Sequence, residues 1–168
     1  FPEVLFESCS GGGGRFDAGM LYYMPQTWTS DDSDAAERMK IQYGTSLVYP
    51  SSAMGAHISA VPNHQNGRVT PMKSRGEVAL GGNFGLELDP GILSPEDKEM
   101  AKAMVQKVKE VRHLTANGVF DRLISPFDSN FCAWQFSSDS EVLLFYGRTL
   151  SIPNYIPRRV YLRSLDPA

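Results

Sequence analysis

Short apolar stretches alternate with helical patterns along the chain up to residue 118. Apolar, β-branched or glycine-rich runs predict four short strands, and apolar positions spaced three or four residues apart predict helices between and after them. The expected strands cover residues 4–7, 26–29, 54–59 and 81–88, and the expected helices cover residues 16–23, 34–43, 68–80 and 94–117. This alternation predicts an α/β fold with parallel strands.

The last of these helices has the clearest boundaries. Ser94 is a preferred N-cap, Pro95 suits the first helical position, and Glu96 and Asp97 suit the first turn. Glycine at residue 118 is a typical stop. The predicted buried stripe consists of Met100, Met104, Val108, Val111 and Leu114.

Beyond residue 118 the apolar period shortens to that of strands. Residues 131–136, 141–146 and 159–165 are short, alternating and rich in aromatic and β-branched side chains. We therefore expect two domains: an α/β domain over residues 1–118 and the start of an antiparallel β domain over residues 119–168.

Polar residues recur where the predicted strands end. Cys9, Asp31, His57 and Asn83 are separated by 22, 26 and 26 residues, the size of one strand-helix repeat. Polar groups at the carboxyl ends of successive strands are typical of a (β/α)8 barrel, but a whole barrel needs about 250 residues. The chain therefore predicts half of a (β/α)8 TIM barrel, unless its four strands close a smaller sheet.

An acidic turn over residues 28–34 is the strongest candidate for chemistry. Asp34 and Glu37 have the spacing of a capping box, so helix capping explains part of the acidic cluster. Asp31 closes the strand and is expected to point into the barrel mouth, where a carboxylate suits general acid/base work on a glycosidic bond. Asp32 is expected to point away. Trp28 offers either a sugar-stacking face or a core side chain.

A glycine-rich loop at residues 11–14 follows the first predicted strand. It lacks the Lys-Ser/Thr pair of a P-loop and the GxGxxG spacing, so phosphate binding is disfavoured. Cys9 is small and lets a ligand approach, but no histidine is fixed beside it as a nucleophile would require. Scattered His and Asp residues predict no metal site. His57, His64 and Arg75 are expected to organise loops through hydrogen bonds.

Composition narrows the classes of partner. A net charge of -3 and a pI near 5.6 provide no basic surface for nucleic acid or an anionic membrane. Two cysteines without CxxC spacing fit a reducing compartment, so a cytoplasmic protein is expected. The first residues have no signal-peptide pattern and no initiator Met, which indicates a chain that starts inside a longer protein.

Several long motifs resemble the α-galactosidases of glycoside hydrolase family 36. They extend from about residue 1 to 126, and the resemblance weakens in the β tail. Ser33 stands where the family resemblance leads us to expect Thr. The motifs are FESCSGGGGRFD at 6–17, GMLYYMPQTWTSDD at 19–32, HISAVPNH at 57–64 and GNFGLELD at 82–89, with shorter matches at 37–38 and 41–46.

This resemblance implies retaining hydrolysis of terminal α-galactosides such as melibiose and raffinose, without a cofactor. It implies that Asp31 is the general acid/base and that Cys9, Gly11 and Gly12 line the galactose site, and it places the chain in the C-terminal half of the barrel. It also implies a homo-oligomer, a tetramer, for the full-length protein.

The family's nucleophile lies in a Lys-x-Asp-x-Asn motif, which does not occur in these 168 residues. The chain alone is therefore expected to be inactive. Two alternatives remain open: a galactosyl-transferring enzyme of the raffinose-synthase type, and a non-catalytic galactose-binding or assembly fragment.

Overall fold

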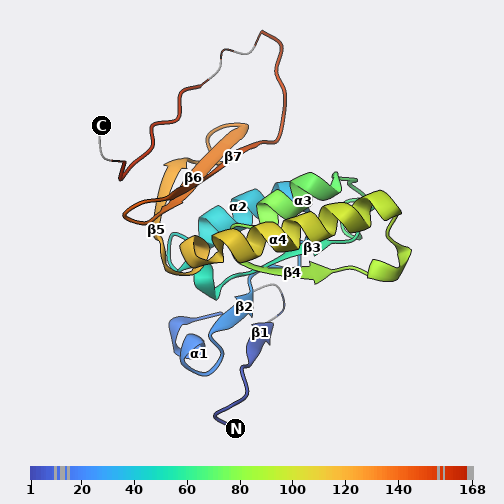
Figure 1. The fold of residues 1–168 in the computed structure, drawn as a ribbon, viewed down its shortest axis with the longest axis vertical. Helices are drawn as coiled ribbons and strands as arrows, with labels where there is room; N and C mark the ends of the chain where they lie inside the picture. Colours follow the sequence, from blue (N-terminus) through green and yellow to red (C-terminus); the bar gives the residue numbers. More distant parts are fainter. Residues whose placement is uncertain (10, 12–13, 15, 155, 157, 166–168) are drawn as a thin grey trace.

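The computed structural model describes residues 1–9, 11, 14, 16–154, 156 and 158–165. Strands and helices alternate up to residue 117, and three further strands follow (Figure 1). The alternating elements are β1 (Glu7–Cys9), α1 (Ala18–Tyr23), β2 (Gln26–Trp28), α2 (Ala35–Thr45), β3 (Gly55–Ser59), α3 (Met72–Ala79), β4 (Asn83–Glu87) and α4 (Pro95–Asn117). Short 3-10 turns, η1 (Ser51–Ala53) and η2 (Pro90–Ile92), precede β3 and α4.

The first four strands are parallel and lie in the order of the sequence. β1 pairs with β2, and β3 pairs with β4, each in parallel register. An isolated parallel bridge between Thr27 and Met54 connects the two pairs. The predicted α/β pattern with parallel strands is therefore confirmed.

The last three strands form an antiparallel sheet in the order β5-β6-β7. They are β5 (Val119–Ile124), β6 (Phe131–Ser137) and β7 (Val142–Arg148). In Figure 1 this sheet lies above α2, α3 and α4, and the parallel strands lie below these helices. The molecule is thus a mixed α/β structure with a small antiparallel sheet.

The sheet and the helices share one hydrophobic core. Trp134, Phe136 and Cys132 of β6 are buried against Met39 of α2 and Leu114 of α4. A second cluster joins Ala56 and Ile58 of β3 to helix α3. Because Ala56 and Ile58 point toward the helices, their neighbours Gly55, His57 and Ser59 point to the opposite face of the strands.

The start of α4 agrees with the sequence prediction. Ser94 caps the helix, accepting a hydrogen bond from the Asp97 backbone N–H at 3.0 Å, and the Gly118 N–H closes it onto the Leu114 carbonyl at 2.7 Å. In the predicted stripe, Val111 and Leu114 are buried, whereas Met104 is half-buried.

Two strand predictions near the chain ends are wrong. The first strand covers Glu7–Cys9, not residues 4–7, because Thr27 Oγ1 donates to the Ser8 carbonyl and sets the register; Val4 and Leu5 remain exposed. Residues 159–165 are not a strand. The Gln135 side chain accepts from the Arg163 N–H and donates to its carbonyl, so an amide side chain replaces the strand partner. β5 was not predicted.

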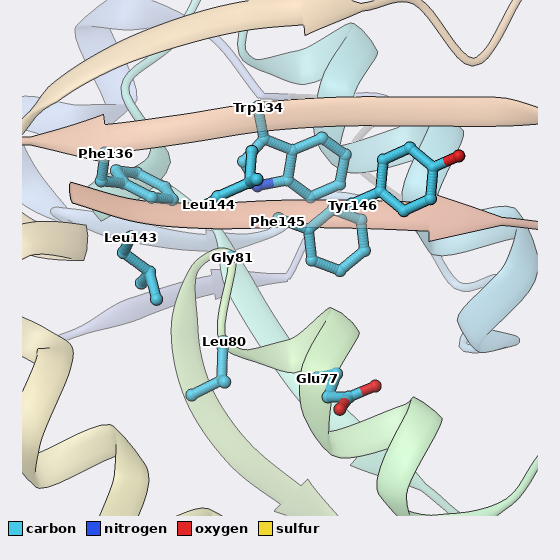
Figure 2. Close-up of a pocket in the computed structure, with 9 residues that line it drawn as sticks. All are labelled: Glu77, Leu80, Gly81, Trp134, Phe136, Leu143, Leu144, Phe145 and Tyr146. Atoms are coloured by element: carbon cyan, nitrogen blue, oxygen red, sulfur yellow. The ribbon is translucent and has the colours of Figure 1, made fainter. Parts of the chain in front are cut away.

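A cavity of about 350 Å³ lies between α3 and the outer strand β7 (Figure 2). Its walls are mainly apolar and aromatic side chains of β6 and β7, with Glu77 and Leu80 on the helical side. It contains none of the predicted site residues.

Candidate active site

The carboxyl ends of the four parallel strands meet at one edge, since parallel strands run in the same direction. β1 ends at Cys9, β2 at Trp28, β3 at Ser59 and β4 at Glu87. Cys9 is an exposed free thiol in register with Trp28. This edge is where α/β enzymes place reactive groups.

Two of the predicted strand-end residues lie elsewhere. His57 is in the middle of β3, opposite Gly85, and Asn83 opens β4. Asn83 opens β4 because its N–H bonds to the Met54 carbonyl at 2.8 Å. His57 is internal because the pairing of β3 with β4 continues beyond the His57–Gly85 pair. Ser59 and Glu87 occupy the strand ends instead.

The three carboxylates of the acidic turn between β2 and α2 differ in burial and in hydrogen bonding. Asp34 is buried and caps α2, with Oδ2 accepting from the Glu37 N–H at 3.1 Å, which confirms the predicted cap. Asp32 is half-buried, and its Oδ1 accepts from the Asp34 N–H at 3.0 Å. Asp31 is exposed. Of the three, Asp31 is the one whose carboxylate is most open to a ligand.

Arg38 of α2 lies beside Trp28, at the end of β2, and was not predicted as a site residue. Its side chain is only 2% exposed, and Nη2 donates to the Gly55 carbonyl at 2.7 Å. Burial lowers the pKa of Arg38 to about 10, against the opposing influence of Glu87 and then Asp32. Arg38 therefore remains a cation at neutral pH.

The guanidinium lies 4.4 Å from the centroid of the Trp28 indole, and the His57 ring stacks on the same indole at 4.3 Å. Trp28 is 7% exposed, which favours the core-packing alternative over a sugar-stacking face. Burial also lowers the pKa of His57, although Glu87 and Glu7 act to raise it. His57 is therefore neutral at pH 7 and packs inside a strand instead of organising a loop.

Unpaired polar atoms gather around the end of β2. Within the described part of the chain, four buried side-chain atoms have no hydrogen-bond partner, and three of them are Thr29 Oγ1 and Arg38 Nε and Nη1. Buried polar groups without partners are rare and often mark functional sites or missing neighbours.

The glycine loop is only partly described. Gly11 has φ +58°, a left-handed conformation that favours glycine. Gly12 lies outside the described residues.

Two more of the residues singled out from the sequence lie in the loop after β3 and in helix α3, which follows that loop. Arg75 performs its predicted role, since Nε donates to the Thr70 carbonyl at 2.9 Å and Nη1 donates to the Ser59 carbonyl. His64 is exposed in this loop. Arg68 pairs with the buried carboxylate of Asp34.

One signal in the sequence points to Arg38. It falls on the same helical face as Ala35, Met39 and Gln42, all of them buried, so a charged residue interrupts an inward stripe. Asn63 and Ser59 had no comparable signal, because their partners lie about 30 residues away along the chain.

Among the described residues, no group of three or more His, Cys, Asp or Glu side chains is placed to hold a metal ion. None of the described helices is both long and apolar enough to cross a membrane.

Fold and site together define an α/β protein whose polar and acidic groups lie at the carboxyl ends of parallel strands, an arrangement typical of α/β enzymes. The chain belongs to the Melibiase family, whose family model matches residues 1–118.

Named relatives match nearly the whole chain. It is 61% identical to the alpha-galactosidase AgaA of Geobacillus stearothermophilus over 168 residues, which is 99% of this chain and 23% of AgaA. It is 53% identical over 99% of its length to the probable alpha-galactosidase G of Aspergillus terreus, of which it also covers 23%. The chain thus spans about a quarter of the length of these relatives.

Solved structures agree with this likeness. A crystal structure of an AgaA variant in complex with raffinose has a TM-score of 0.95 at 60% identity, covering 99% of this chain and 23% of AgaA. A second AgaA variant was solved in complex with stachyose, with the same TM-score, identity and coverage.

Proposed function

We propose that the complete protein carrying this chain is an α-galactosidase that hydrolyses terminal α-galactosyl residues of oligosaccharides such as melibiose and raffinose. The observation that carries the proposal is the exposed Asp31 carboxylate at the carboxyl end of β2 in a chain of the Melibiase family. The raffinose and stachyose bound to AgaA variants support the substrate class.

The fold supports half of a TIM barrel as the scaffold. Four parallel strands in sequential order, with α2, α3 and α4 on one side, match four successive units of such a barrel. In this proposal residues 1–118 form the C-terminal half of the catalytic barrel and residues 119–168 begin the C-terminal β domain. The rest of the complete protein closes the barrel.

In the proposed mechanism Asp31 acts twice. As an acid it protonates the glycosidic oxygen while a carboxylate nucleophile attacks the anomeric carbon, and the bond to the leaving sugar breaks. As a base it then takes a proton from the water that cleaves the glycosyl-enzyme intermediate. We assign the nucleophile to no residue of this chain, so the isolated chain is expected to be inactive.

The remaining assignments follow from position. Cys9, Gly11 and Gly12 lie next to the strand edge in sequence and are proposed to line the galactose site. Trp28 is proposed to support the galactose site from below, through its contacts with Arg38 and His57, and not to stack on the sugar. We further propose a cytoplasmic homo-oligomer, a tetramer, without a cofactor.

The test compares Asp31→Asn with Asp32→Asn in the complete protein. Asp31→Asn should lower kcat on melibiose about 100-fold or more, since its leaving group needs a proton. Galactosides with an activated aryl leaving group should be affected much less. Asp32→Asn is the matched control and should keep most activity.

Three results would contradict the proposal. Full activity of Asp31→Asn on melibiose would move the acid/base role to Asp32 or elsewhere. Galactose passed to sucrose instead of water would make the protein a transferase. Galactose binding by calorimetry without turnover would leave a non-catalytic binding protein.

A further inference from the structure

Ser33, in the middle of the acidic turn, takes part in two hydrogen bonds, one with the end of β3 and one with the loop after it. Its carbonyl accepts from Ser59 Oγ at 2.7 Å, and its hydroxyl accepts from Asn63 Nδ2 at 3.1 Å. All three residues are buried, with 4–5% of their surface exposed. The backbone two residues after Asp31 is therefore fixed to the end of β3 and to the loop that follows it.

Asn63 is also the centre of its own loop. Its Oδ1 accepts from the backbone N–H groups of Gln65 and Asn66 at 2.9 and 3.2 Å, and its N–H donates to the Arg68 carbonyl at 2.9 Å. The loop is thus closed on Asn63, and Nδ2 is left to reach outward to Ser33. An Asn in this position transmits the geometry of one loop to another.

A second connection runs parallel to the first. Arg68, at the end of the same loop, pairs with Asp34, which caps α2. Arg75 in turn bonds the Ser59 and Thr70 carbonyls at the two ends of the loop. The turn that carries Asp31 is therefore attached to the β3 side at both Ser33 and Asp34.

The consequence for catalysis follows from distance. A general acid must lie within hydrogen-bond reach of the atom it protonates, and a displacement of about 1 Å costs about 100-fold in rate. Asp31 is exposed, so side-chain packing does little to fix it. Its position is set mainly by the backbone of the turn, and hence by the bonds to Ser33.

We infer that Asn63, together with Ser59, is a positioning residue for the acid/base Asp31 and acts through Ser33. This inference rests on the proposed function. Asn63 does not touch the substrate in this account; it keeps the Asp31 carboxylate at the glycosidic oxygen. Its loss should therefore impair proton donation selectively and leave attack at the anomeric carbon intact.

The experiment uses the complete protein with Ser33→Ala, Asn63→Ala and the double variant. Ser33→Ala removes the hydroxyl from the turn without touching the loop, so it remains informative if Asn63→Ala fails to fold. Each variant is assayed on melibiose and on an aryl α-galactoside with an activated leaving group. Gln65→Ala, an exposed side chain in the same loop, is the matched control.

Ser33→Ala and Asn63→Ala should each lower kcat on melibiose about tenfold or more, with KM and the aryl-galactoside rate little changed. The double variant should lose no more than the single ones, because both remove the same bond. Gln65→Ala should match the wild-type protein. Equal losses on both substrates, or no loss, would overturn the positioning role.

The two proposals fail differently. If the wild-type protein hydrolyses neither substrate, the proposed function falls and the positioning role falls with it. If Asp31→Asn shows the selective loss on melibiose but Ser33→Ala and Asn63→Ala do not, the proposed function stands and only the positioning role is overturned.

Discussion

Every residue of β6 is buried, whereas β2 has three residues and leads into a turn whose first carboxylate is exposed. β6 pairs along its whole length with β7 and from Ala133 onward with β5, and its aromatic side chains pack on the helices. β2 pairs with β1 and meets β3 at a single bridge, beside unpaired atoms of Thr29 and Arg38. The antiparallel sheet thus has a central strand that is buried throughout, whereas the end of β2 leads to exposed or unpaired polar groups.

The difference shows which region tolerates most of the described buried polar atoms that lack hydrogen-bond partners. A buried guanidinium with two unpaired nitrogens costs stability, and such features persist where function requires them or the surrounding structure compensates for them. The buried core between β6 and the helices contributes stability that offsets this cost. Substitutions in the two regions should therefore have different effects, and four comparisons test this separation.

The largest effect on stability is expected at Trp134. It is 2% exposed and stacks on Phe145 with ring centroids 4.0 Å apart. Trp134→Ala should lower the free energy of unfolding by about 3–5 kcal/mol, because it leaves a large cavity. Denaturant unfolding of the complete protein measures this, with Leu144→Ala as a control because Leu144 is 41% exposed. Similar losses in both variants would contradict the assignment of the core.

A smaller effect is expected at Arg38. Arg38→Met removes the donor to the Gly55 carbonyl and should destabilise the protein by about 1–3 kcal/mol. It also removes two unpaired nitrogens, so the loss should fall below that of Trp134→Ala. Stability equal to or above that of the wild-type protein would show that these unpaired nitrogens outweigh the bond to Gly55.

The smallest effect concerns pH and His57. Because its pKa is lowered in the folded state, the unfolded chain takes up a proton below about pH 6.5 that the folded chain resists. The resulting loss of folding stability is absent above that pH and grows as the pH falls below it. The groups that influence His57 are Glu87, Glu7 and Arg38.

His57→Asn should therefore lose less stability than the wild-type protein between pH 7 and pH 5. Thermal unfolding of both proteins across this range measures the difference, and His64→Asn serves as an exposed control. If the stabilities of the two proteins fell in parallel, a half-buried neutral imidazole at His57 would be ruled out.

Local signals predicted much of this structure, and long-range ones were missed. The caps at Ser94 and Asp34 were predicted because they depend on residues three positions away. The roles of Arg38 and Asn63 depend on partners 17 and 30 residues away, which no local pattern reveals. The tail at residues 159–165 was predicted as a strand, since its pattern gave no sign that the Gln135 amide would bind it.

The most direct test of the account measures turnover and stability together for Asp31→Asn and Trp134→Ala in the complete protein. Asp31→Asn should keep the wild-type midpoint of unfolding and lose about 100-fold or more of its kcat on melibiose. Trp134→Ala should unfold at markedly lower denaturant and, at a temperature where it is folded, retain most of its kcat. If Asp31→Asn remained active, or if both variants lost stability and turnover in parallel, the separation of core and active site would be contradicted.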